Sequence, residues 1–95
     1  MTLEGDPVSW LVLERGWRVA DRDGTEVGTV DEVIGDKDVD IFDGLAVSTG
    51  LLSKPRYVPA ERVERIVEGT VQLALTKDEV DGLPDWDGKL SSDVE

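Results

Sequence analysis

The sequence predicts a small all-β protein, a β-barrel with five or six mostly antiparallel strands and one or two short helical turns. Three observations carry this prediction. Short runs rich in valine, isoleucine and leucine recur between turn residues. The pair Asp23-Gly24 separates two such runs, which is typical of a hairpin. A chain of 95 residues has room for one domain with one modest core.

The expected strands follow from the position of these apolar runs. They are 17–21, 26–36, 40–49, 56–58, 63–67 and 70–75. Turns at 22–25, 36–39 and 68–69 separate them. The second run breaks strict alternation, so we expect a bulge near Gly28. In the third run, Ile41, Leu45 and Val47 are expected on one face and Phe42 on the other.

The N-terminal segment 6–15 has two interpretations. Asp6 and Pro7 are placed to begin a short helix with Val8, Leu11 and Val12 on one face, and Gly16 would end it. A short strand over 10–13 is the alternative. We favour the helical turn.

Two further helical turns are expected later in the chain. Ala60-Glu61-Arg62 follows the proline that ends the fourth strand. Thr76 and Glu79 have the spacing of a capping box, with Leu75 and Val80 placed to form a hydrophobic staple. The chain therefore divides into an N-terminal extension (1–9), a barrel (10–83) and a flexible acidic tail (84–95).

Acidic residues dominate the composition. The chain has 22 Asp and Glu against 10 Lys and Arg, a formal net charge of −12. Such a surface repels phosphate backbones and anionic lipids, so we expect no nucleic-acid binding and no membrane insertion. The charge favours basic protein partners. The N-terminus has no signal-peptide pattern and no apolar run is long enough to span a bilayer, so we expect a cytoplasmic protein.

Several kinds of chemistry are excluded by residues that the chain lacks. There is no cysteine and no histidine, so disulfides, thiolate zinc sites and Ser-His-Asp triads are impossible. Asp36, Asp38 and Asp40 alternate as in a calcium loop, but Ile41 and Val47 stand where such a loop needs glycine and glutamate. We therefore expect no metal site, no cofactor and no enzymatic activity.

Two motifs and their order resemble the PRC-barrel family. The run GWRVADRDGTEVGTV (16–30) is similar to that family's opening hairpin, and YVPAERV (57–63) to its second signature. The hairpin over 63–75 completes a resemblance that covers 10–75. The family includes the cytoplasmic domain of the photosynthetic reaction-centre H subunit, the C-terminal domain of the ribosome maturation factor and short stand-alone bacterial proteins. The resemblance implies a β-barrel that assembles with proteins and has no catalytic residues. The 95 residues contain neither a membrane helix nor the maturation factor's N-terminal domain, so neither relative's role is expected.

The function expected is a non-enzymatic protein-interaction and assembly module that self-associates. The candidate contact residues are four apolar side chains without an evident place on a strand's inner face, Trp10, Leu51, Leu52 and Trp86, and the two cations beside the leucines, Lys54 and Arg56. A twofold homodimer that includes the 50–55 loop would bury the two leucines. Two alternatives stay open: the leucines plug the barrel, or the protein is a small-ligand or cation-binding barrel.

Overall fold

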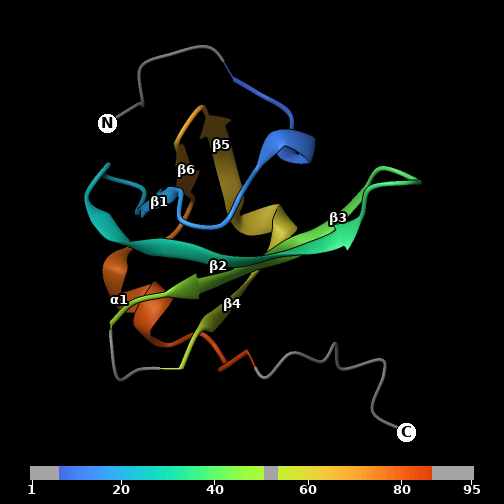
Figure 1. Cartoon of the computed structure of the whole chain (residues 1–95). Helices are drawn as coiled ribbons and strands as arrows, with labels where there is room; N and C mark the ends of the chain where they lie inside the picture. The colour runs from blue at the N-terminus through green and yellow to red at the C-terminus, as the bar shows by residue number, and fades with distance from the viewer. Residues whose placement is uncertain (1–6, 51–53, 87–95) are drawn as a thin grey trace, which may run out of the picture.

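Six strands form one sheet that curls into a half-barrel (Figure 1). The structure, a computed structural model, describes residues 7–50 and 54–86. The strand order is β4-β3-β2-β1-β6-β5, and every neighbouring pair is antiparallel except β1 and β6. The strands are β1 (Arg18–Ala20), β2 (Glu26–Asp36), β3 (Ile41–Ser48), β4 (Arg56–Pro59), β5 (Val63–Val67) and β6 (Thr70–Leu73). The predicted all-β fold class is confirmed.

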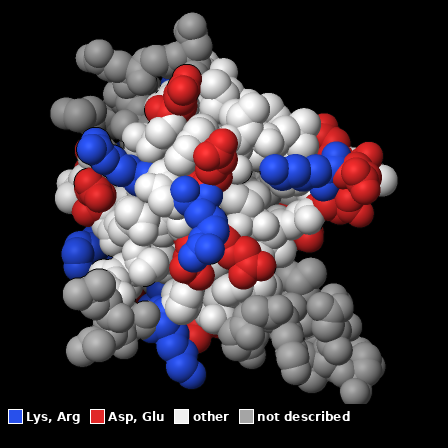
Figure 2. All heavy atoms as spheres, in the orientation of Figure 1, with Lys and Arg blue, Asp and Glu red and all other residues white. Residues whose placement is uncertain are grey.

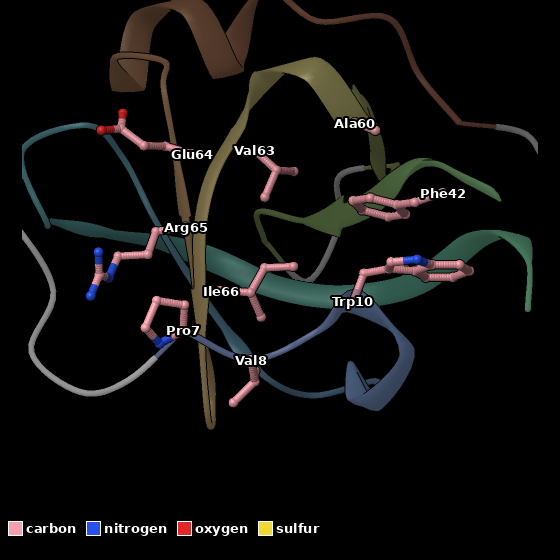
Figure 3. Close-up of a pocket in the computed structure, with 9 residues that line it drawn as sticks. All are labelled: Pro7, Val8, Trp10, Phe42, Ala60, Val63, Glu64, Arg65 and Ile66. Carbon is pink, nitrogen blue, oxygen red and sulfur yellow. The ribbon is translucent and has the colours of Figure 1, made fainter. Parts of the chain in front are cut away.

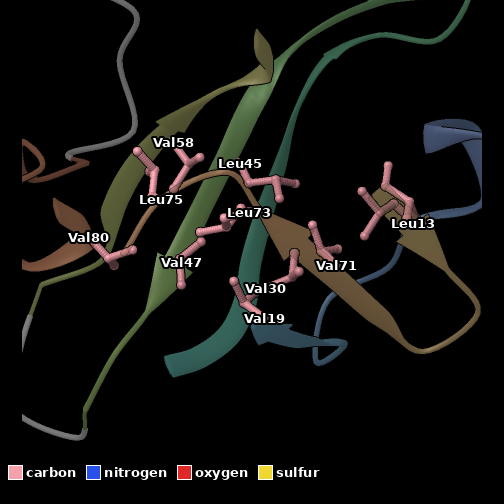
Figure 4. Packing of buried hydrophobic residues seen from close by; sticks show 11 residues of the cluster. Leu13, Val19, Val30, Leu45, Val47, Val58, Val71, Leu73, Leu75 and Val80 are labelled. Atoms are coloured by element: carbon pink, nitrogen blue, oxygen red, sulfur yellow. The ribbon is translucent and has the colours of Figure 1, made fainter. Parts of the chain in front are cut away.

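Aliphatic side chains fill the inside of the curled sheet (Figure 4). Leu45, Val58 and Val71 have no exposed surface. Each such side chain contributes about 1.5–3 kcal/mol by leaving water. The buried cluster consists of Leu13, Val19, Val30, Leu45, Val47, Val58, Ile66, Val71, Leu73, Leu75 and Val80.

The N-terminal helical turn is present, but it is shorter than predicted. Helix η1 (Trp10–Val12) is a 3-10 turn, and the Ser9 side chain accepts a hydrogen bond from the Leu11 amide at its start. Pro7 lies before the turn, and Asp6 lies outside the described residues. Val8, which was expected on one helical face with Leu11 and Val12, lies before the turn, and Leu11 and Val12 are 38% and 51% exposed.

The other two helical turns lie where the sequence places them. Helix η2 (Ala60–Arg62) follows β4, and helix α1 (Lys77–Asp81) follows β6. The capping box is complete: the Glu79 amide donates to Thr76 Oγ1 at 3.1 Å, and the Thr76 amide donates to Glu79 Oε1 at 2.8 Å. This cap fixes α1 so that the fully buried Val80 reaches the core.

Bulges set which side chains face the core. The expected bulge near Gly28 is present, because Val19 and Ala20 pair with Gly28 and Glu26 and leave Val27 unmatched. A second irregularity leaves Asp43 unmatched in β3. This extra residue reverses the alternation, so Phe42 packs against the core and Ile41 is 52% exposed. The predicted faces of Phe42 and Ile41 are therefore wrong.

Both edges of the sheet carry a terminal segment of the chain. Along β4, the Tyr57 amide donates to the Pro84 carbonyl at 2.9 Å and the Trp86 amide to the Pro55 carbonyl at 2.7 Å. Along β5, the Val8 amide donates to the Ile66 carbonyl at 2.8 Å. These bonds occupy backbone groups that an edge strand otherwise offers to other chains. Within residues 7–50 and 54–86, no helix has the length and apolarity needed to span a bilayer.

Candidate functional site

The structure separates the predicted contact residues that it describes, which are Trp10, Lys54, Arg56 and Trp86. Trp10 lies against the start of β3, whereas Arg56 and Trp86 lie together at the edge of β4. Lys54 precedes β4 and is exposed. Leu51 and Leu52 lie outside the described residues, so their predicted contact role stays a prediction.

Trp10 is held in place by contacts on two sides of its ring. It stacks on Phe42 with ring centroids 5.1 Å apart and planes inclined by 14°. Its Nε1 donates a 2.7 Å hydrogen bond to Oδ1 of Asp40, which adopts a left-handed backbone conformation with φ of 56°. Gly35 leaves room for the indole, since a Cβ there would lie 3.1 Å from the ring. The β2–β3 hairpin thus anchors the N-terminal segment through one tryptophan.

Trp10 and Phe42 form one end of an open groove of about 390 Å³, the Trp10 groove (Figure 3). Val63 and Ile66 of β5 lie between this aromatic end and the charged end at Glu64 and Arg65 (Figure 3). The lining consists of Pro7, Val8, Trp10, Phe42, Ala60, Val63, Glu64, Arg65 and Ile66. The groove therefore presents a mainly apolar surface with charge at one end.

A second groove lies on the other side of Val8. It measures about 340 Å³, and we call it the Trp17 groove. Its lining is Val8, Val12, Glu14, Trp17 and Glu68. Val8 belongs to both grooves, and its hydrogen bond to Ile66 fixes the short segment that runs between them.

Trp86 packs on the chain itself, over the outer face of the sheet. Its ring stacks on Tyr57 at 5.4 Å and 27°, and its Nε1 donates to Oε1 of Glu32 at 2.9 Å. Tyr57 in turn lies over Gly44, where a Cβ would come within 3.0 Å of the phenol ring. Gly44 therefore has to lack a side chain for the two rings to lie flat on the sheet.

The Tyr57 hydroxyl is part of the same patch. It donates a 2.9 Å hydrogen bond to the Asp43 carbonyl. Burial raises the pKa of Tyr57 above its ordinary value of 10.0, and the charges of Asp43 and Glu61 raise it further. The phenol is thus a neutral donor near neutral pH, with a structural role.

Arg56 is already engaged within the chain. Its guanidinium Nη1 donates at 3.0 Å to the Leu83 carbonyl and at 3.0 Å to Oδ1 of Asp85. These bonds tie the segment after α1 to β4. Arg56 is therefore less available for contacts outside the chain than the exposed Lys54.

Two of the acidic side chains, Asp21 and Glu79, shape the local structure. Asp21 is buried, and its Oδ1 accepts hydrogen bonds from the Asp23 and Thr25 amides at 2.9 Å, which shapes the β1–β2 turn. The hydrogen bond from the Thr76 amide lowers the pKa of Glu79. In the part of the chain that the structure describes, no three acidic side chains come together as a metal site would need.

Sequence reasoning found Trp10 but missed the rest of its groove. Phe42 was assigned to the opposite face because the Asp43 bulge has no clear sequence signal. Val63 and Ile66 read as ordinary strand residues, and only the fold brings them beside Trp10. One sequence feature could have indicated the aromatic end of the groove: the single phenylalanine of the chain lies close to an acidic turn.

The comparison with protein families gives a match over the part of the chain that contains the strands. The family described as "Uncharacterized protein conserved in bacteria (DUF2171)" matches residues 14–81. The chain belongs to the DUF2171 family. The match runs from before β1 to the end of α1, so the whole sheet of this DUF2171 protein is included. Trp10 and Trp86 lie outside the matched residues, as do the two terminal segments along the sheet edges. No curated protein matches the chain in sequence.

Proposed function

We propose that this DUF2171 protein is a non-enzymatic interaction module of the PRC-barrel type, and that it binds another protein through the Trp10 groove. The observation that carries the proposal is the open apolar groove with a stacked Trp10–Phe42 pair at one end. Large aromatic side chains in such a position are typical of the centre of protein interfaces. The cytoplasm is the location proposed for this function.

The composition of the interior supports an external binding surface. Eleven buried aliphatic side chains pack together inside the curled sheet. An interior filled by side chains leaves little room for a ligand, which supports binding on the outer surface. The segments that resemble PRC-barrel signatures correspond to the β1–β2 hairpin, to β4 with η2, and to the β5–β6 hairpin. These are the parts that build the sheet, and β4, η2 and β5 also lead into the groove.

A small apolar molecule is the second candidate occupant. The groove volume of about 390 Å³ lies within the ~300–1,000 Å³ typical of small-molecule pockets. The two candidates differ in how much surface they cover, because a protein segment extends beyond the groove whereas a small molecule stays within it. Binding that also perturbs residues of the Trp17 groove favours a protein segment.

Blocking the groove tests the proposal. Ala60 lines the groove and is half-buried, so Ala60→Arg places a long side chain into it. Ala74 is exposed and lies outside the groove lining, so Ala74→Arg adds the same charge as a matched control. We expect proteins that co-purify with the wild type from a native host to be lost with Ala60→Arg and kept with Ala74→Arg. Equal recovery with both variants refutes binding through this groove.

Self-association is a separate part of the proposal. Light scattering at moderate salt is expected to show a twofold dimer, and salt strengthens it by screening the repulsion between two chains of net charge −12. Leu51→Asp with Leu52→Asp is expected to restore the monomer. A monomer at high micromolar concentration refutes the dimer, and a dimer that survives both substitutions refutes the contact at the 50–55 loop.

A further inference from the structure

We infer that the partner segment in the Trp10 groove is basic: a lysine- or arginine-rich stretch of another protein that also carries aliphatic side chains. This inference rests on the proposed function, because it assigns a chemical class to the occupant of the same groove. It is carried by the combination of an apolar floor with carboxylates around it.

The floor of the groove accepts apolar groups. Val63 and Ile66 lie between the stacked Trp10–Phe42 pair and the charged end of the groove (Figure 3). Trp10, Phe42 and Val63 also pack against the core cluster, which fixes their positions before binding. An aliphatic side chain, or the hydrocarbon stem of lysine or arginine, fits such a surface.

Carboxylates outnumber cations around the floor. Glu64 lines the Trp10 groove, while Glu14 and Glu68 line the adjoining Trp17 groove, and all three side chains are exposed. Arg65 is the one cationic side chain in the two linings. Figure 2 shows an uncharged surface above the centre of the molecule with both acidic and basic side chains at its margins.

Lysine and arginine match both parts of this surface. Their stems are apolar and their heads are cationic, so one side chain can contact the floor and a carboxylate at once. The net charge of −12 adds a long-range attraction that raises the association rate of a basic segment. Nucleic acids are anionic, so these carboxylates repel them. A second copy of this chain has 22 acidic against 10 basic side chains and is repelled for the same reason.

Val8 gives the bound segment a path between the two grooves. It lines both of them, and its hydrogen bond to Ile66 holds it on the edge of β5. A segment that crosses Val8 contacts Glu64 on one side and Glu14 or Glu68 on the other. The inference therefore predicts that carboxylates of both grooves contribute to the same binding event.

Three labelled peptides of equal length test the chemical class. The first contains lysine, leucine and serine, the second has glutamate in place of lysine, and the third has serine in place of leucine. In fluorescence anisotropy at low salt, we expect saturable binding of the first, weaker binding of the third and none of the second. Raising the ionic strength from about 0.05 to about 0.3 M is expected to weaken the first peptide's binding by screening.

Charge-neutral variants test the role of the carboxylates. Glu64→Gln with Glu68→Gln is expected to weaken binding of the lysine peptide about fivefold, as the sum of two solvent-exposed ion pairs. Asp23→Asn with Glu26→Gln removes the same charge from the exposed β1–β2 hairpin and is the matched control. We expect the control to change the affinity by less than about twofold, because its charges act only at long range.

The outcomes separate this inference from the proposed function. Equal weakening by the two double variants, or equal binding of the glutamate peptide, overturns the basic class. If Ala60→Arg still blocks peptide binding in either of these cases, the groove keeps its proposed function. Binding of the lysine peptide that Ala60→Arg leaves unchanged overturns both. Failure of the lysine peptide to bind at all overturns the basic class alone, since the co-purification experiment tests the groove independently.

Discussion

The stacked Tyr57–Trp86 pair is expected to stabilise the protein through a measurable pairwise coupling. Trp86→Leu removes the stack and the 2.9 Å hydrogen bond to Glu32. A stacked aromatic pair contributes about 0.5–1.5 kcal/mol beyond area burial, and an exposed hydrogen bond about 0.5 kcal/mol. We therefore expect Trp86→Leu to lower the free energy of unfolding by about 1–2 kcal/mol. For a domain of this size, each 1 kcal/mol lowers Tm by about 4–8 °C.

A double-mutant cycle isolates the contact between the two rings. Urea unfolding of Trp86→Leu, Tyr57→Leu and the double variant is expected to give a coupling of about 1 kcal/mol. Trp17→Leu combined with Tyr57→Leu is the control, since Trp17 precedes β1 and that strand lies three places from β4 in the sheet. Its coupling should fall within about 0.3–0.5 kcal/mol of zero. If the Tyr57–Trp86 coupling is equally small, the reasoning that the pair fixes the C-terminal segment on β4 fails.

Four further predictions concern stability. Thr76→Ala is expected to destabilise the protein by about 0.5–2 kcal/mol through loss of the bond to the Glu79 amide, and an unchanged thermal midpoint would show that the cap contributes nothing. Gly44→Ala is expected to cost about 1–3 kcal/mol in chemical unfolding, because its methyl group would collide with the Val58 carbonyl and the Tyr57 ring; a neutral effect would contradict this packing. Since the folded state raises the pKa of Tyr57, its contribution to stability is fully present below the unfolded value of 10.0 and is lost as the pH rises through the folded pKa. Unfolding measured across alkaline pH should show this loss in the wild type and less of it in Tyr57→Phe. Millimolar calcium is expected to leave Tm unchanged apart from general salt effects, and a saturable rise that Asp38→Asn abolishes would contradict this.

Local signals in the sequence predicted most of the secondary structure. The bounds of β2 and η2 match the predicted ranges, because glycines, a proline and charged turns mark their ends. The capping box was predicted from Thr76 and Glu79 alone, since its two hydrogen bonds join residues only three positions apart. Such features can be predicted from the sequence because they depend only on residues a few positions apart in the chain.

The candidate site was less accessible to sequence reasoning because its contacts are long-range. Trp10 bonds to Asp40, 30 positions away, and Trp86 to Glu32, 54 positions away. The bulge at Asp43 decides that Phe42 faces Trp10, and it depends on how β2 and β3 pair. Both tryptophans were predicted to be contact residues because neither has a place on a strand's inner face, and only the fold separates the groove at Trp10 from the patch at Trp86.

The covered sheet edges bear on how a partner can bind. A strand added to β4 would have to replace Pro84 and Trp86, whose backbone bonds, ring stack and Arg56–Asp85 ion pair hold them there. A strand added to β5 would have to replace Val8 at Ile66. Each replacement gives up existing hydrogen bonds before it makes new ones, so strand addition gains little. Side chains that enter the Trp10 groove leave these edge hydrogen bonds in place. For the proposed partner, the arrangement therefore favours recognition through side chains, in which charge selects the partner and the apolar floor retains it.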